Sequence, residues 1–222
     1  MIKVHHLNNS RSQRILWMLE ELRVAYEVVR YERNPKTMLA PAALKAVHPL
    51  GKSPVIEDNG RIIAESGAII DYLGQMYGQG SLWPDAESPA YRQVSYWLHY
   101  AEGSLMPPLL LKLVFDTVRK RPMPFFAKPV ARRICDEVTR QFVGPQIETH
   151  LGFVESQLER REWLVGERLS AADIQMSFPL EAAMARGTEQ GHHPNIAAYV
   201  ARFQARPAYR RALEVGGPYD YA

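Results

Sequence analysis

Two short apolar runs joined by an Asn-Gly turn restrict the fold of this chain more than any other feature. The runs are PVIE at 54–57 and RIIAE at 61–65, and Asp58-Asn59-Gly60 lies between them. An Asn-Gly pair favours the tight hairpin whose two central residues both have positive φ. The sequence therefore predicts an antiparallel strand pair, around which the rest of this half of the chain has to fold.

The segments around this hairpin alternate between strand and helix patterns. The expected elements are a strand at 2–6, a helix in RSQRILWMLEEL at 11–22, a strand in AYEVVRY at 25–31, a short helix at 41–47 and, after the hairpin, a helix in SGAIIDYLGQMY at 66–77. Asn9 or Ser10 is placed to cap the first helix. The order βαβαββα predicts an α+β, thioredoxin-like domain in which helices cover a mixed four-stranded sheet.

The second half of the chain has only helix patterns. A stretch of breakers and polar residues, GQGSLWPDAESP, comes first and indicates a linker. The expected helices then cover 89–106, 108–120, 128–160 with a possible break at Gly144-Pro145, 170–185, 194–205 and 207–215. We therefore predict a thioredoxin-like N-terminal domain at 1–79, followed by an all-α helical C-terminal domain at 87–222. In the latter, Ser170 and Asp173 have the spacing of a capping box, which is a structural role.

Composition and charge argue against several partners. The 27 basic and 24 acidic residues leave a net charge of only +3, and no basic run contains interleaved aromatics, so we expect no nucleic-acid partner. No apolar run reaches membrane-spanning length and the start does not resemble a signal peptide, so we expect no membrane partner and a cytoplasmic location. The single cysteine, Cys135, excludes an intramolecular disulfide, and no pattern points to a metal.

Five motifs in order resemble the cytosolic glutathione S-transferases over essentially the whole chain. They are NNSRSQRILWMLEEL, HPLGKSPVIED, AESGAIIDYL, VGERLSAADI and ARPAYRRAL. Each motif is weak alone, but their order and spacing are specific. The chain looks like serine-type bacterial and fungal members, which have HPLG and EGSL.PP segments. It does not resemble the classes that carry a tyrosine where this chain has His5-His6-Leu7. The resemblance implies glutathione as co-substrate, no metal, a small hydrophobic electrophile as second substrate, and a homodimer.

The resemblance also assigns a role to the loop before the hairpin. The peptide bond between Ser53 and Pro54 is expected to be cis, which turns the chain tightly. The backbone of Val55 is then expected to pair with the cysteinyl unit of glutathione, like one more strand at the edge of the sheet. Taken without the motif around it, Pro54 would be an ordinary trans proline.

The ends of the tripeptide are assigned in the same way. The hydroxyl of Ser66 and the first amides of its helix are expected to hold the γ-glutamyl carboxylate, and Glu65 the γ-glutamyl ammonium. Lys52 is placed to meet the glycine carboxylate, with Arg11 and His48 as weaker candidates. A plain helix start at Glu65 and a solvated loop lysine at Lys52 are the alternatives.

Ser10 is the expected catalytic residue. It lies four residues before Arg14, which is the spacing of the serine in serine-type members of the family. Its hydroxyl would hydrogen-bond the glutathione sulfur, and the positive end of the following helix would help to hold the thiolate. Asn9 and Ser12 are alternatives, and Ser10 acting only as a helix cap is another.

The helical domain is expected to bind the second substrate. By resemblance, Tyr100, Ser104 and Pro108 are expected to line the pocket, and Glu102 is expected to reach glutathione across a dimer interface. Two other functions are compatible with the same motifs. One is a glutathione-dependent peroxidase that reduces organic hydroperoxides. The other is a non-catalytic binding or regulatory protein, because a fold does not determine a function.

Overall fold

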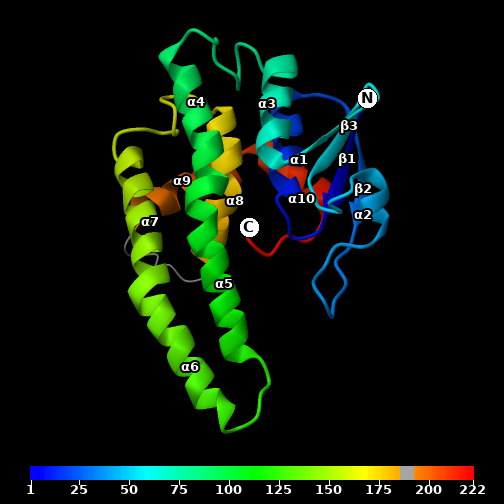
Figure 1. Cartoon of the computed structure of the whole chain (residues 1–222). Helices are drawn as coiled ribbons and strands as arrows, with labels where there is room; N and C mark the ends of the chain where they lie inside the picture. Colours follow the sequence, from blue (N-terminus) through cyan, green and yellow to red (C-terminus); the bar gives the residue numbers. More distant parts are fainter. Residues whose placement is uncertain (186–192) are drawn as a thin grey trace.

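Figure 1 shows the computed structural model of the chain, which describes residues 1–185 and 193–222. The strands and the first helices lie on one side, and the long helices of the second half lie on the other. The boundary between 1–79 and 87–222 stays a prediction, because the two parts share one continuous apolar core. No helix in the described ranges is long and apolar enough to cross a membrane.

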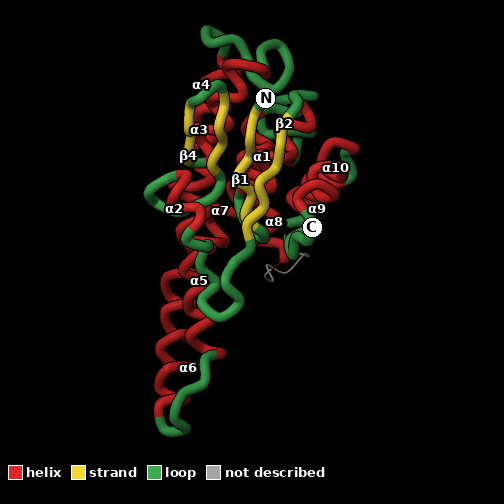
Figure 2. The backbone as a smooth tube through the Cα atoms, turned by 90° about the vertical axis from the view of Figure 1, so that its right-hand side faces the viewer, coloured by secondary structure: helices red, strands yellow, loops and turns green. Residues whose placement is uncertain are grey.

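The first part has the predicted order βαβαββα. Its elements are β1 (Ile2–Leu7), α1 (Ser12–Leu22), β2 (Tyr26–Tyr31), α2 (Ala43–Val47), β3 (Val55–Asp58), β4 (Arg61–Ala64) and α3 (Ser66–Tyr77). The strands pair in the order β2-β1-β3-β4, with β1 and β2 parallel and the other pairs antiparallel. Figure 2 shows α1 and α3 behind the strands. The predicted mixed sheet with a helical layer is confirmed.

The hairpin that restricts the fold is formed as expected. Asp58 pairs with Arg61 across the turn. Asn59 has φ 49° and Gly60 has φ 79°, so both central residues are left-handed. An Asn-Gly pair tolerates this conformation better than other residues do.

The second part is all-helical, as predicted. The elements are α4 (Pro89–Tyr100), the π-helical turn η1 (Ala101–Leu105), α5 (Met106–Lys120), α6 (Ala127–Val138), the π-helical turn η2 (Thr139–Val143), α7 (Gly144–Leu158), α8 (Ala171–Ala185), α9 (Pro194–Gln204) and α10 (Pro207–Gly216). Figure 1 shows α5 and α6 extending away from the rest of the molecule as a hairpin.

The break expected between 106 and 108 is wrong, because a π-helical turn carries the helix across it. The helix expected over 128–160 likewise continues through the possible break at Gly144-Pro145. Met106 N–H bonds the carbonyl of Ala101, five residues back, just before Pro107 and Pro108. Proline has no N–H and crowds the carbonyl four residues before it, and a widened turn relieves both problems. The same device precedes Pro145, where a Cβ on Gly144 would lie 2.9 Å from the carbonyl oxygen of Thr139.

Helix α1 is held between the two parts. Trp17 is fully buried, stacks on Phe203 at 5.3 Å and meets Tyr209 edge-on at 5.4 Å between ring centroids. These partners come from α9 and α10, so the end of the chain packs on the first helix. Burial of large aromatic side chains contributes strongly to core stability. The core thus places the start of α1 at the junction of the two parts.

Candidate functional site

The turn between β1 and α1 carries the expected catalytic residue. Arg11 directly precedes α1 and makes no side-chain cap. Of the two expected caps, Asn9 and Ser10, it is Ser10 that caps the first turn, because its Oγ accepts a hydrogen bond from Ser12 N–H at 3.2 Å and its carbonyl accepts one from Gln13 N–H at 3.2 Å. The positive pole of α1 therefore begins at these residues.

The hydroxyl of Ser10 has partners within the protein. Ser10 is 4% exposed, and its Oγ donates to the carbonyl of Leu7 at 2.7 Å. The Oγ of Ser12 lies 2.8 Å from the same atom. A hydrogen bond from Ser10 to a ligand sulfur therefore requires this hydroxyl to rotate away from Leu7.

The two alternatives to Ser10 are also engaged. Ser12 is fully buried, and its Oγ lies 2.9 Å from Nδ1 of His6. Burial lowers the pKa of His6 to about 4, so this imidazole is neutral at pH 7. Asn9 donates from Nδ2 to Asp220 at 2.8 Å and accepts from Asp220 N–H at 2.9 Å. Asn9 thus ties the C-terminal segment to the start of α1.

The loop before β3 has the predicted cis bond between Ser53 and Pro54. The Oγ of Ser53 donates to the carbonyl of His5 at 2.8 Å, which joins this loop to β1. Val55, however, pairs with His5 on one side and Ala64 on the other. The expectation that Val55 lies at a sheet edge is wrong, because β3 is an interior strand. In the described ranges, no hydrogen bond engages the backbone N–H or C=O of Ser53.

The start of α3 has an unusual backbone. Glu65 is exposed and is the N-cap of α3, with φ 72°. A non-glycine residue with a positive φ is uncommon, and such residues are often found at functional sites. Ser66 is buried, and its Oγ accepts a hydrogen bond from Arg14 at 2.9 Å, which leaves the hydroxyl proton for another acceptor. Lys52 is exposed and forms no ion pair with the rest of the described chain.

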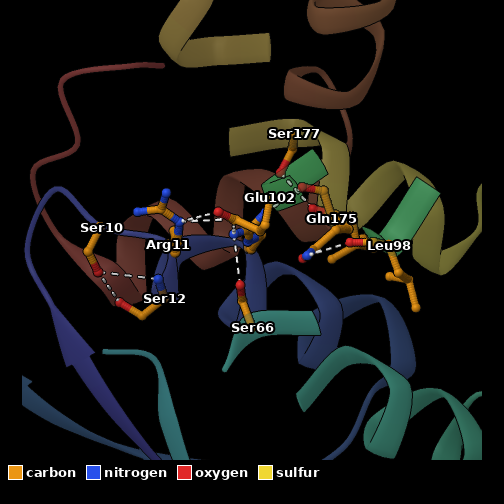
Figure 3. Close-up of polar contacts among 10 residues, drawn as sticks. Ser10, Arg11, Ser12, Ser66, Leu98, Glu102, Gln175 and Ser177 are labelled. Carbon is orange, nitrogen blue, oxygen red and sulfur yellow. Dashed lines mark hydrogen bonds and ion pairs between the residues drawn. The ribbon is translucent and has the colours of Figure 1, made fainter. Parts of the chain in front are cut away.

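A buried arginine, Arg14, connects these segments to the helical part, and Figure 3 shows two of the residues that it bonds, Ser66 and Glu102. Arg14 donates to the carbonyl of Gln175, to Ser66 and to the carboxylate of Glu102. Arg11 donates from Nε to both carboxylate oxygens of Glu102, at 2.9 and 3.0 Å. Burial by itself would raise the pKa of Glu102, but the two guanidinium groups hold it below its ordinary value. Glu102 is therefore an ionised link within its own chain, and its expected reach across a dimer interface stays a prediction.

The residues expected to line the second-substrate pocket are spread over the helix around η1. Tyr100 is buried and its hydroxyl lies 2.8 Å from Nδ1 of His150 on α7. Pro108 is buried and Ser104 is partly exposed. Because Tyr100 precedes Glu102 by two residues, the two side chains point to opposite sides of the helix. The structure therefore does not bring Tyr100 together with the charged cluster.

The cluster of Arg14, Ser66 and Glu102 was not expected as a unit. Arg14 stands inside the apolar run RILWML, and Ser12–Leu19 are all buried. An arginine in such a run is the signal that would have indicated a buried charge in need of partners. In the described part of the chain, no group of three or more His, Cys, Asp or Glu side chains could hold a metal ion.

A buried carboxyl beside this cluster gives a testable pH dependence. Burial raises the pKa of Glu181 from 4.5 to about 7, although Tyr209, Gln204 and Tyr219 donate hydrogen bonds to it. Between these values the folded state holds a proton that the unfolded state has lost, so stability falls as pH rises. Glu181→Gln should remove this fall and gain about 2 kcal/mol, relative to wild type, between pH 5 and 8.

The measurement is urea unfolding of both proteins at several pH values. The exposed Glu167→Gln is the matched control and should follow wild type. Parallel pH profiles for wild type and Glu181→Gln would show that the folded and unfolded carboxyls have similar pKa values.

The fold and the site together define a class of protein. A thioredoxin-like domain with a cis-proline loop is joined to an all-helical domain, and the starts of α1 and α3 meet through Arg14 and Ser66. The class is that of two-domain proteins in which a thioredoxin-like domain and an all-helical domain meet at the starts of these two helices.

Comparisons with known proteins identify the family. The family models described as Glutathione S-transferase, N-terminal domain and C-terminal domain match residues 10–76 and 136–207. The chain is 34% identical to Glutathione S-transferase 1 of Saccharomyces cerevisiae over 96% of this chain and 94% of that protein. It is 37% identical to Glutathione S-transferase 3 of Schizosaccharomyces pombe over 96% of this chain and 87% of that protein. The chain therefore belongs to the glutathione S-transferase family, and we class it as a glutathione transferase.

Solved structures show the same fold. A glutathione S-transferase from Actinobacillus pleuropneumoniae has a TM-score of 0.82 and 34% identity, and the match covers 100% of this chain and 95% of that one. A sphingomonad glutathione S-transferase, solved in complex with glutathione, has a TM-score of 0.73 and 20% identity, covering 97% and 98% of the two chains. The expected fold class is thus confirmed.

Proposed function

We propose that the protein conjugates the glutathione thiolate to small hydrophobic electrophiles. The observation that carries this proposal is the meeting of the first turns of α1 and α3, where Arg14 bonds Ser66 at 2.9 Å. Two helix N-termini that converge on one place form a site for negative charge. Glutathione brings such charges as a carboxylate and as the reacting thiolate.

The tripeptide would lie across the loops of the thioredoxin-like part. The Ser66 hydroxyl and the first amides of α3 bind the γ-glutamyl carboxylate, and the exposed Glu65 binds the γ-glutamyl ammonium. The unpaired backbone of Ser53 replaces that of Val55 as the partner of the cysteinyl unit. Lys52 is exposed in the same loop and binds the glycine carboxylate.

The thiol has to ionise at neutral pH. A thiol with a pKa near 8.5 is only about 3% ionised at pH 7, so the site has to lower that pKa by roughly two units. The positive pole of α1 supplies part of this effect. The Ser10 hydroxyl supplies the rest once it turns from the Leu7 carbonyl to the sulfur, and the thiolate then attacks the electrophilic carbon.

Replacing Ser10 by alanine tests this role. Glutathione should still bind, but the pKa of its thiol should rise by about one to two units, because a hydrogen bond to a charged group contributes about 1.5–3 kcal/mol. The measurements are calorimetric binding and the thiolate absorbance of the complex against pH. Ser156→Ala is the control, since this exposed α7 hydroxyl donates a hydrogen bond to the carbonyl of Phe153, three residues before it on the same helix.

Each other outcome has a definite meaning. An equal thiol pKa in wild type and Ser10→Ala would assign the activation to α1, Asn9 or Ser12. Failure of both proteins to bind glutathione would refute the proposed function and favour the non-catalytic alternative. Reduction of organic hydroperoxides without conjugation would favour the peroxidase.

The remaining assignments stay predictions from the resemblance. They are the pocket around Tyr100, Ser104 and Pro108, the homodimer and the cytoplasmic location. A screen of electrophiles would test the pocket, and a sedimentation measurement would test the homodimer.

A further inference from the structure

Arg11 carries hydrogen-bond donors that the protein leaves unused. Its Nε bonds both oxygens of Glu102, but within the described residues its two terminal nitrogens make no hydrogen bond. Neither terminal nitrogen is a buried atom without a partner, so both reach solvent, and the side chain as a whole is 34% exposed. In Figure 3 the terminal nitrogens of Arg11 point away from Glu102 and carry no dashed line. Arg11 therefore presents a solvent-accessible cationic fork.

The fork is held in place from two sides. Glu102, which Arg14 also binds, fixes the Nε edge of the guanidinium. The ring of Phe178 lies beneath it, with Cζ of Arg11 5.0 Å from the ring centroid. A planar guanidinium held in this way loses little conformational freedom when it binds a ligand. Donors positioned in advance stabilise charge that appears during a reaction more effectively than mobile ones.

The position of the fork lies between the two halves of the proposed reaction. Arg11 directly precedes α1 and follows Ser10, where the sulfur is expected. Its partner Glu102 belongs to η1, and α5 continues from there with Leu110 and Val114, which are 51% and 47% exposed. Leu110 and Val114 follow Met106 by four and by eight residues, so they lie on one side of α5. The unused donors thus lie next to the residue where the sulfur is expected, and the helix that carries their partner Glu102 continues into a segment with exposed apolar side chains.

We propose that Arg11 binds the oxygen on which negative charge develops in the second substrate, so that the enzyme favours α,β-unsaturated carbonyl compounds. This inference rests on the proposed function. The thiolate sulfur forms a bond to the β-carbon, the carbon–carbon π bond breaks, and its electron pair moves toward the carbonyl to give an enolate. The enolate oxygen accepts hydrogen bonds from Arg11. The α-carbon then takes a proton from water, which replaces the proton released when the thiol ionised.

An alkyl halide makes a different demand on the site. The sulfur displaces a halide that leaves in line with the new bond, and no oxygen takes up charge. Arg11 therefore contributes selectively to the carbonyl class. The sequence had suggested Arg11 as a weaker partner of the glycine carboxylate of glutathione, which a kinetic experiment separates from this role.

The experiment compares oct-3-en-2-one with 1-iodohexane as second substrates. Arg11→Gln should lower kcat/KM about tenfold to a hundredfold for the enone, and within about threefold for the halide, with an unchanged KM for glutathione. Arg11→Lys keeps the charge but loses the planar fork, and its kcat/KM for the enone should fall between those of wild type and Arg11→Gln. Arg140→Gln is the matched control, since Arg140 is 70% exposed and pairs with Glu137 three residues away.

Several results would overturn the inference. An equal loss for both electrophiles, or a raised KM for glutathione, would place Arg11 at the thiolate or the tripeptide. Unchanged kinetics in both Arg11 variants would leave the proposed function standing and refute the role of Arg11 alone. If the wild type conjugates neither compound, the proposed function fails and this inference fails with it.

Discussion

Replacing Asp173 by alanine is expected to lower the free energy of unfolding by about 3–5 kcal/mol. The carboxylate is fully buried. One oxygen accepts from Leu164 N–H at 2.9 Å and Tyr199 O–H at 2.7 Å, and the other from Ser170 N–H and Oγ, both at 2.8 Å. Alanine would leave all of these donors buried without an acceptor, and each such group carries a desolvation penalty.

Urea unfolding of wild type and Asp173→Ala measures the effect. Asp85→Ala is the control, because this exposed carboxylate accepts from Glu87 N–H and should change stability by less than about 1 kcal/mol. Asp173→Asn keeps one acceptor oxygen and should lose less than the alanine variant. A loss below about 1 kcal/mol for Asp173→Ala would mean that water or a rearranged α8 satisfies the donors.

Replacing Arg14 by methionine should affect both stability and ligand binding. Methionine fills a similar apolar volume but leaves Ser66 Oγ and the carbonyl of Gln175 without their donor. Glu102 keeps Arg11 and some exposure to solvent, so the expected loss is about 2–4 kcal/mol. Because Ser66 loses the group that orients it, the Kd for glutathione should rise about tenfold, which corresponds to about 1.4 kcal/mol.

Urea unfolding and calorimetric titration with glutathione measure the two effects. The control is Arg211→Met, since Arg211 is half-exposed and pairs at 2.7 Å with Glu20, which lies on α1 as Arg14 does. A pair whose arginine is half in solvent contributes about 1 kcal/mol. If Arg14→Met loses stability but binds glutathione as wild type does, Arg14 has a structural role only.

Much of the fold could be predicted because its signals are local. The Asn59-Gly60 turn, the strand and helix periodicities and the breakers of the linker act within a few residues. The contacts of Asp173 could be predicted only in part. Its bond to Ser170 N–H follows from a spacing of three, whereas its bond to Tyr199 does not. The helix break expected near Pro107 was wrong, and the possible break at Gly144 was left open, because the choice between ending and widening a helix depends on what packs against it.

The candidate site divides in the same way. The cis bond before Pro54 and the helix start at Ser66 were expected from motifs, and both are present. The interior position of Val55 and the engaged state of Ser10 were not, because sheet order and hydroxyl partners depend on other segments.

By itself, the sequence determined the secondary structure, the mixed sheet and the motifs that lead to glutathione, since periodicity and turn chemistry act over short distances. Only the tertiary structure decided how the charges are arranged. Arg14 meets Glu102 across 88 residues of chain, and Asn9 meets Asp220 across 211. A buried or half-buried charge needs a partner, but the partner is whichever group the packed core brings within hydrogen-bonding distance. The unused fork of Arg11 is a product of that packing.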